Sequence, residues 1–407
     1  MLAALGQVLI YIVPFLLVLT FIVTIHELGH FLVARAFGVK IDRFAIGFGR
    51  PLYQRTDRHG VEWRLGWIPA GGYVKFSGDL DASSVPDQAG LAELKQRITT
   101  EKGPAAVRDY YHFKPVWQRM LIVAAGPVAN FILAITIFAL LFMTLGAQLT
   151  PARVGQVQAG SPAAAAGFRP GDLITAVEGR TIEDGSEVTR AVMLSSGDPL
   201  RFTVERAGQA VELIAVPERR MENDPIAGRI QVGRIGVLLE ARREDIRHVR
   251  YNPAEAVVAG AKQTVDVIGS TLKYLGRLVT GRESGDQLSG PIGIAKASGS
   301  LTNMAVQANP DPTATATAIN LGLTLVNLAA ILSIGIGFLN LMPIPVLDGG
   351  HLVFYAYEAV ARRPVAARFQ EAGYRVGLAL LAGFMLFATW NDLQKLNLFQ
   401  FLGGLVS

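Results

Sequence analysis

The feature that most constrains this chain is its apolar N-terminal segment, in which the first charged residue is Glu27. The stretch 8–34 is longer than the roughly 20 apolar residues that a helix needs to cross a bilayer. Glu27 stands in the sequence HELGH, between His26 and His30. A membrane-spanning helix is therefore predicted to carry three ionisable side chains in the apolar phase, where such groups are costly and usually functional.

The spacing within HELGH suits a metal centre. His26 and His30 are one helical turn apart, so both imidazoles can reach one tetrahedral Zn²⁺, and Glu27 is close enough to activate a metal-bound water. The alternative is that the histidines are polar contacts between packed helices and that Glu27 pairs with a basic residue. Because the chain has only 6 His in 407 residues, we favour the metal interpretation.

The composition indicates an integral membrane protein with a sizeable soluble part. Hydrophobic residues make up 51% of the chain and charged residues 17%, whereas the middle of the chain is polar. The absence of Cys excludes disulfides and thiolate ligands, which leaves His, Asp and Glu for a zinc site. The net charge of +5 does not indicate a nucleic-acid partner, because the basic residues are not interleaved with aromatics and many flank apolar segments.

Four apolar segments are predicted to span the membrane, at about 8–34, 120–145, 321–341 and 376–389. Lys and Arg follow the first segment, precede the second and separate the third from the fourth. Basic ends of this kind face the cytoplasm. Both termini and the polar middle are then predicted to be extracytoplasmic, with residues 35–119 on the cytoplasmic side.

A third zinc ligand is predicted after the third span, in the sequence NLMPIPVLDGGH that runs from Asn340 to His351. Two prolines break the helix there. They place Asp348 in irregular backbone, which is tolerated at membrane depth where protein or water surrounds it. Asp before Gly-Gly is otherwise usually a turn or helix-cap residue, and without HELGH that alternative would be preferred.

The pairing of HELGH with NLMPIPVLDGGH resembles the site-2 protease family of intramembrane zinc metalloproteases, of the RseP type. The likeness extends to GFGRPLYQRTDRHGVEWRLGWIPAGGYVKFSGD after the first span, AAGPVANF in the second, LSGPIGIAK before the third and NDL after the fourth. The resemblance implies these roles: zinc ligands His26, His30 and Asp348, catalytic glutamate Glu27, and substrate-contacting Asn340. It assigns no role to His351.

The polar middle, residues 152–217, has short β-forming runs between glycine-rich turns and a small-residue helix at SPAAAAG. Its sequence AGSPAAAAGFRPGDLITAVEGRTI resembles a bacterial PDZ domain, a fold that binds peptides as an added strand. A spacer of the same shape is the alternative. RseP-type enzymes often carry two such domains, whereas this chain shows one.

Three other segments have their own patterns. Residues 44–76 have β-formers with spaced Gly and Pro and predict a hairpin; the resemblance implies that it enters the membrane and pairs with unwound substrate, and an ordinary cytoplasmic loop is the alternative. Residues 81–108 are polar and predict a mobile linker. Residues 253–282 predict an amphipathic helix, lying on the outer membrane surface or packed against the PDZ-like domain.

The predicted fold is a polytopic α-helical membrane protein of about four transmembrane helices, with a membrane-associated β-hairpin loop and an inserted PDZ-like α+β domain. Its predicted parts are transmembrane helix 1 with HExxH (1–36), a membrane-reentrant hairpin-like region (37–80), a cytoplasmic linker (81–118), transmembrane helix 2 (119–146), the PDZ-like domain (150–220), an extracytoplasmic connector with the amphipathic helix (221–315), transmembrane helix 3 with LDGG (316–350), and a loop, transmembrane helix 4 and C-terminal tail (351–407).

The resemblance implies a zinc metalloendopeptidase of the bacterial inner membrane that acts in regulated intramembrane proteolysis and stress response. Its expected partner and substrate is a single-pass membrane protein, an anti-sigma factor, already shortened outside by a site-1 protease; remnant signal peptides are a second class. The PDZ-like domain would exclude uncut ectodomains. Two alternatives remain: a metallopeptidase for soluble or prenylated chains, which would supply Glu as third ligand, and a non-enzymatic membrane scaffold.

Overall fold

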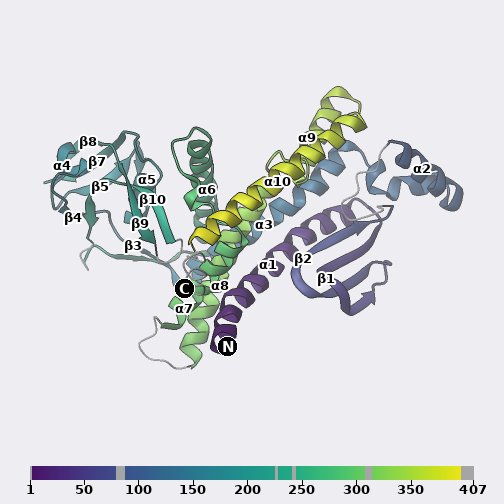
Figure 1. The fold of residues 1–407 in the computed structure, drawn as a ribbon, viewed down its shortest axis with the longest axis horizontal. Coiled ribbons are helices and arrows are strands. Elements are labelled where there is room, and N and C mark those ends of the chain that lie inside the picture. The colour runs from purple at the N-terminus through teal and green to yellow at the C-terminus, as the bar shows by residue number, and fades with distance from the viewer. Residues whose placement is uncertain (1, 79–87, 225–227, 241–243, 308–313, 396–407) are drawn as a thin grey trace, which may run out of the picture. The chain divides into compact units, whose positions relative to one another are not determined.

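The computed structural model describes residues 2–78, 88–224, 228–240, 244–307 and 314–395 (Figure 1). The chain divides into two compact units. Unit 1 comprises Met1–Ile137 and Ile294–Phe387, and unit 2 comprises Phe138–Gly293 and the stretch that begins at Ala388.

The described residues include four long apolar helices, which lie in unit 1 except for the last turns of the second and fourth: α1 (Leu2–Ala36), α3 (Val116–Leu145), α8 (Ala314–Asn340) and α10 (Ala367–Lys395). By length and composition, the stretches 11–36, 116–145, 315–340 and 367–395 are candidate membrane spans. The prediction of about four such helices is therefore confirmed among the described residues. The fourth is longer than the predicted 376–389, because its ends are helical but carry charged residues that interrupt the apolar pattern.

Small residues bring α1 and α3 into close contact. A Cβ on Gly29 of α1 would overlap the carbonyl oxygen of Ala125 in α3 and would lie 2.8 Å from Cβ of Ala129. Close approach at glycine is the usual way in which membrane helices gain packing contacts, since lipid supplies no hydrophobic driving force between them. The backbones of the helices that carry HELGH and AAGPVANF are thus in contact.

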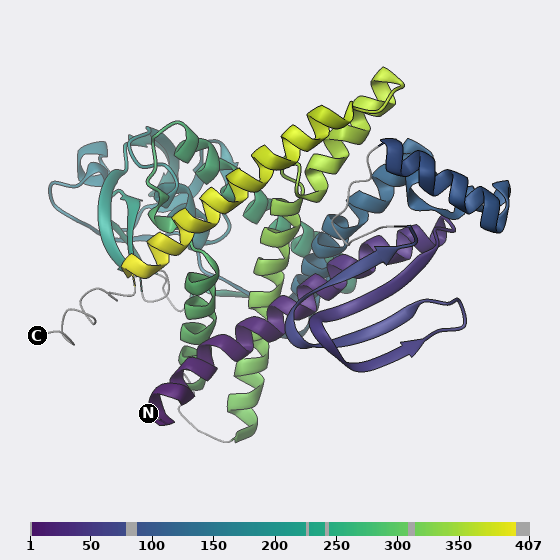
Figure 2. The ribbon, with the colours of Figure 1, turned by 45° about the vertical axis from the view of Figure 1, so that its right-hand side comes forward.

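A long hairpin follows α1, as predicted for residues 44–76. Strands β1 (Ile41–Thr56) and β2 (Glu62–Phe76) pair antiparallel, and the hairpin lies alongside the C-terminal half of α1 (Figure 2). Phe31 of α1 packs edge-on against Phe44 and Trp63 of the two strands, with ring centroids 5.4 and 5.3 Å apart. These aromatic contacts hold the hairpin against α1.

Part of the predicted mobile linker is helical. Residues Gln88–Lys102 form α2, followed by the 3₁₀ turns η1 (Pro104–Asp109) and η2 (Tyr111–Phe113). A small core of Leu94, Ile98 and Tyr110 gives this segment its own packing, which its polar composition did not indicate. The linker residues 81–87 lie outside the described part of the chain.

Helix α9 (Asp348–Ala361) follows α8 after a short irregular stretch. It is tied to residues around the start of α3 by two polar contacts. Arg119 pairs with Glu358 at 2.6 Å, and the hydroxyl groups of Tyr111 and Tyr355 are 3.0 Å apart. Helix α9 therefore has a fixed position within unit 1.

Unit 2 contains a four-stranded antiparallel sheet in the order β6-β5-β7-β8 and two short helices. Their bounds are β5 (Leu173–Val177), β6 (Arg180–Thr181), β7 (Leu200–Arg206), β8 (Gln209–Ala215), α4 (Pro162–Ala166) and α5 (Gly185–Met193). Phe168 and Phe202 pack edge-on in its core, with ring centroids 5.3 Å apart. The strands and the short helix at SPAAAAG match the content predicted for residues 152–217; α5 is a second short helix.

The same core extends past the predicted boundary at residue 220. The chain adds the hairpin β9 (Glu218–Asp224) and β10 (Gly228–Arg234), then β11 (Val237–Leu239), which pairs with β4 (Val154–Val157). Ile235 is buried in the core of the sheet. Finally β12 (Arg247–Val249) pairs with β3 (Ala147–Leu149), so the two ends of the folded region meet. Strands of three residues leave little pattern in a sequence, which explains why the boundary was placed too early.

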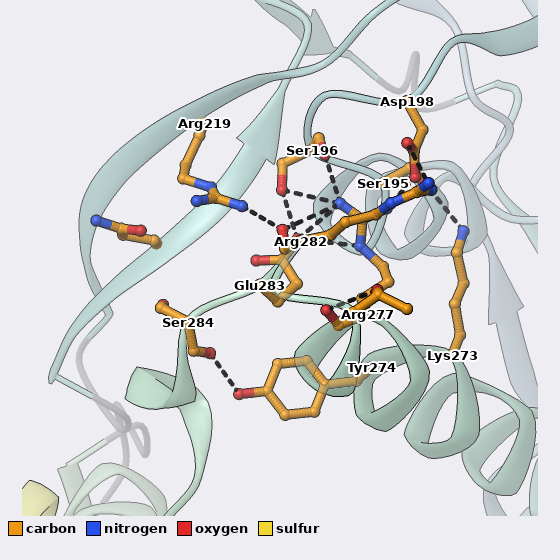
Figure 3. A network of polar contacts seen from close by, with 12 residues as sticks. Ser195, Ser196, Asp198, Arg219, Lys273, Tyr274, Arg277, Arg282, Glu283 and Ser284 are labelled. Carbon is orange, nitrogen blue, oxygen red and sulfur yellow. Dashed lines mark hydrogen bonds and ion pairs between the residues drawn. The ribbon is translucent and has the colours of Figure 1, made fainter.

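Three helical segments follow: α6 (Pro253–Val279), η3 (Gly285–Gln287) and α7 (Pro291–Gln307). Helix α6 begins with a capping box formed by Asn252 and Glu255, so its start is fixed by sequence. Near its end, buried Arg277 contacts Asp198 and the carbonyl oxygen of Ser196, and pairs with buried Glu283 at 3.1 Å (Figure 3). The end of the amphipathic helix predicted at 253–282 is thus packed against the strand-rich part of unit 2.

A candidate metal centre in unit 1

Three side chains of unit 1 bring one ligand atom each to a common point. Nε2 of His26 is 3.2 Å from Nε2 of His30 and 3.1 Å from Oδ2 of Asp348, and His30 Nε2 is 3.5 Å from the same oxygen. Zinc with metal-ligand distances of roughly 2.0–2.1 Å in tetrahedral geometry separates its ligand atoms by about 3.3 Å. The three atoms therefore have the spacing that one such ion requires.

The two histidines belong to α1, and Asp348 lies where the chain turns back after α8. Asp348 is the first residue of α9, and its side chain caps no helix: the N-cap position is Leu347, without a side-chain cap bond. A Cβ on Gly349 or Gly350 would overlap carbonyl oxygens of the preceding turn, at Leu341 and Ile344. Only glycine lets α9 begin so close to the end of α8, which brings Asp348 back to α1.

Helix α3 supports the other side of both imidazoles. Nδ1 of His30 lies 2.8 Å from the carbonyl oxygen of Ile122, and Nδ1 of His26 lies 3.2 Å from the side-chain amide of Asn130. Between these two, a Cβ on Gly126 would overlap Nε2 of His30 and would lie 2.8 Å from Cε1 of His26. These α3 partners were not assigned from sequence, although all three belong to the second span and two belong to AAGPVANF.

The other two predicted site residues lie beside the ligand group. Oε2 of Glu27 accepts a hydrogen bond of 3.2 Å from the backbone N–H of Val74 in β2. Nδ2 of Asn340, the last residue of α8, is 3.5 Å from Nε2 of His26. The structure thus brings together His26, Glu27, His30, Asn340 and Asp348, from segments up to 322 positions apart in sequence.

His351 is not part of the ligand group. Both of its ring nitrogens are 3.3 Å from the hydroxyl group of Tyr374. Burial lowers the pKa of His351 below its ordinary value, which favours the uncharged ring.

Comparisons with known proteins decide the family. The model of Peptidase family M50 matches residues 14–384. The chain belongs to Peptidase family M50, the site-2 protease family. It is 49% identical over 397 residues to the metalloprotease MmpA of Caulobacter vibrioides, with 98% of each chain covered. It is 44% identical to relatives in Agrobacterium fabrum and Brucella suis that are provisionally named zinc metalloproteases, with 97% and 94% of this chain covered and 98% and 94% of theirs.

These matches identify the chain as a zinc metalloprotease. They agree with the geometry of the site, in which two imidazoles and one carboxylate offer the donor atoms that zinc accepts. Four apolar helices long enough to span a bilayer agree with a membrane-embedded member of the family.

Proposed function

We propose that this M50 protease hydrolyses a peptide bond within or near the transmembrane segment of single-pass membrane proteins. The observation that carries the proposal is the set of three ligand atoms 3.1–3.5 Å apart, next to Glu27 on a helix of membrane-spanning length. A hydrolytic site on such a helix is suited to substrates that lie in the bilayer themselves.

In this proposal His26, His30 and Asp348 hold the zinc ion. Bound zinc supplies a Lewis acid for the substrate carbonyl and makes its water acidic enough to ionise near neutral pH. Glu27 takes the proton of the attacking water and returns it to the leaving nitrogen. One oxygen of Glu27 is held by Val74 N–H, which leaves the other free for the water.

Asn340 is proposed to bind the substrate backbone. Its amide lies at the ligand group, 3.5 Å from His26 Nε2, and an amide can both donate to and accept from a peptide unit. An unwound substrate exposes such groups, whereas a helix keeps them in its own hydrogen bonds. Asn340 would therefore favour substrate that has lost its helical structure.

The hairpin is proposed to enter the membrane and to present an edge to the unwound substrate. Large apolar side chains within its two strands are exposed, among them Leu52 (71%) and Trp67 (61%). Exposed apolar surface of this kind is unfavourable in water and suits lipid. A free strand edge can add an extended peptide through main-chain hydrogen bonds.

We further propose the bacterial inner membrane as the location, with residues 35–119 cytoplasmic and both termini and the PDZ-like domain extracytoplasmic. The support is the excess of Lys and Arg at the ends predicted to face the cytoplasm. Helix α6 would then lie against the extracytoplasmic surface of the inner membrane. It exposes four apolar side chains at a spacing of seven residues: Val258, Val265, Leu272 and Val279.

Unit 2 is proposed to act as a PDZ-like size filter. Its groove, of about 250 Å³, is lined by apolar residues of α5 and of the β10–β11 segment, with Arg220 and Arg234 also in its lining. The proposed substrate is an anti-sigma factor already shortened by a site-1 protease, with remnant signal peptides as a second class. A bulky ectodomain would be kept from the site.

The proposal is tested by incubating the purified full-length protein in detergent with tagged single-span proteins, with and without a zinc chelator. Cleavage within the span that stops with chelator and returns with added zinc is the expected result. Cleavage of soluble peptides alone would favour the other class of metallopeptidase. Absence of both zinc and cleavage would favour a scaffold.

A further inference from the structure

One face of α3 lies along the two histidines of HELGH. Ile122, Gly126 and Asn130 are spaced by four residues, which places them on one side of a helix. His30 faces Ile122, His26 faces Asn130, and Gly126 lies between them. Each imidazole therefore has one α3 partner at its Nδ1 atom, on the side away from Asp348.

Burial of the polar side chain of Asn130 at this position is energetically unfavourable. It is fully buried, at 0% exposure, in a helix of membrane-spanning length. Its side-chain nitrogen lies 3.2 Å from His26 Nδ1, and its Oδ1 has no hydrogen-bond partner among the described residues. A buried amide that is only partly satisfied is unfavourable, so its one contact requires an explanation.

The contact of Asn130 is with Nδ1 of His26. Whether Nδ1 carries the imidazole hydrogen determines whether Nε2 can bind a metal. Nε2 of His26 lies in the ligand group. To ligate through Nε2, a neutral imidazole must carry its hydrogen on Nδ1, and that hydrogen needs an acceptor. The carbonyl oxygen of Ile122 serves His30 in this way. In the described structure the only polar side chain hydrogen-bonded to His26 Nδ1 is Asn130.

An amide can meet this need because its oxygen and nitrogen occupy equivalent places. Turning the terminal amide of Asn130 by 180° exchanges Oδ1 and Nδ2 without moving any other atom. In one orientation the amide donates to Nδ1, and in the other Oδ1 accepts the Nδ1 hydrogen. Only the second orientation leaves the Nε2 lone pair of His26 free for a metal.

We propose that Asn130 is a positioning residue for the metal centre, which accepts the Nδ1 hydrogen of His26 and so directs its Nε2 lone pair into the ligand group. This inference rests on the proposed zinc-binding role of His26. A purely structural role is the competing explanation, because the backbone oxygen of Asn130 also accepts a 2.9 Å hydrogen bond from Ser333 of α8. The positioning role requires a hydrogen-bond acceptor on the side chain of residue 130, whereas the structural role depends on its backbone oxygen.

Three variants of the full-length protein in detergent separate them. Asn130→Leu keeps the branching of the side chain, with larger methyl groups, and removes the acceptor. Asn130→Asp keeps an acceptor, and Ser333→Ala removes the neighbouring helix contact while leaving the amide in place. Zinc affinity is measured by competition with a chromophoric chelator. The absorption spectrum of the Co²⁺-substituted protein reports the ligand geometry without reference to cleavage.

We expect Asn130→Leu to bind zinc about 10–100-fold more weakly, the effect usual for the outer partner of a ligating histidine, and to lose or shift the tetrahedral Co²⁺ bands. Asn130→Asp should stay within about threefold of wild type, and Ser333→Ala within about twofold, since both keep an acceptor at Nδ1. Rescue by the acceptor-only side chain is not expected from packing alone.

A folded Asn130→Leu protein with wild-type zinc affinity would overturn the inference. An Asn130→Asp protein as weak as Asn130→Leu would also overturn it. Should Asn130→Leu fail to fold, Asn130→Asp decides alone, and a loss of more than about tenfold counts against the inference. If wild-type protein binds no zinc, the proposed function fails instead, so the two failures are distinguishable.

Discussion

The backbone N–H of Val74 in β2 donates a hydrogen bond to Oε2 of Glu27 in α1, across 3.2 Å. The second strand of the hairpin after HELGH thus contacts the residue proposed as the general base. Gly72 of the same strand lies beside this contact, because a Cβ there would come within van der Waals distance of Cγ of Glu27, at 3.6 Å. The hairpin is therefore part of the site as well as a surface beside it.

Replacing Glu27 with Gln should abolish cleavage and leave zinc bound. The amide keeps the size of the side chain but cannot take a proton from water, and general-base catalysis contributes typically 10²–10⁴-fold. We expect cleavage of a tagged single-span substrate to fall by at least about 100-fold, at unchanged zinc content by elemental analysis. Turnover near the wild-type rate would remove Glu27 from its assigned role.

Val74→Pro tests the contribution of the hairpin to the orientation of Glu27. Proline removes the donor N–H, whereas Val74→Ala keeps the N–H and shortens only the side chain. Cleavage should drop by about tenfold in the proline variant, the scale of a lost outer contact, with zinc content maintained. The alanine variant is the matched control and should cleave normally; equal losses in the two variants would show that the side chain matters and the hydrogen bond does not.

Asp348→Asn should weaken zinc binding by more than the roughly 10–100-fold effect of an outer partner. The change leaves the size of the side chain and removes the negative charge that lies 3.1 and 3.5 Å from the two imidazoles. Chelator competition measures the affinity. His351→Gln, three residues away and outside the ligand group, is the control. Equal zinc affinity in Asp348→Asn and wild type would contradict ligation.

A methyl group at Gly126 should displace both imidazoles. The added Cβ would overlap Nε2 of His30 and come within 2.8 Å of His26 Cε1, and a misplacement of about 1 Å at a catalytic site can cost on the order of 100-fold in rate. Gly126→Ala is therefore expected to lose both zinc affinity and cleavage. Gly335→Ala in α8, where a Cβ meets nothing within 4 Å, should retain both. Normal zinc binding by Gly126→Ala would argue against the close packing of α3.

The size-filter role is tested by a deletion that the β3–β12 pairing makes possible. Because Leu149 pairs with Arg247, residues 150–246 can be replaced by a short turn that joins the two strands. The shortened protein should cleave substrates with intact ectodomains, and wild type should cleave only trimmed ones. Continued dependence on prior trimming would exclude the filter. Zinc content of the shortened protein shows whether the metal centre survives.

The spans could be predicted from the sequence, and His26, Glu27 and His30 could be singled out as candidate site residues, because their signals are local or chemically specific; Asn340 was suggested by the family resemblance alone. Two histidines one turn apart, next to a glutamate in an uncharged segment, leave few alternatives. The contacts that hold those residues gave no such signal. Val74 contributes a backbone N–H, which every residue except proline has, and Ile122 contributes a backbone carbonyl.

Elements that depend on distant pairing were also beyond prediction. Strand β11 has three residues and pairs with β4, about 80 positions earlier, so the predicted PDZ-like domain ends at residue 220, before this strand. Helix α2 was missed because its polar surface hides the small core of Leu94, Ile98 and Tyr110. Amphipathic α6 was predicted well, since its apolar residues recur at helical spacing over 27 residues.

The metal centre draws its donors from two separate helices, because the histidines belong to α1 and Asp348 is the first residue of α9. A bound ion would therefore crosslink α1 to α9, in addition to the contacts that Glu358 and Tyr355 already make from α9. A displacement of α9 away from α1 would then separate the carboxylate of Asp348 from the two imidazoles that would hold the ion with it. A faster extraction of the ion by a chelator would consequently indicate that these two helices have separated.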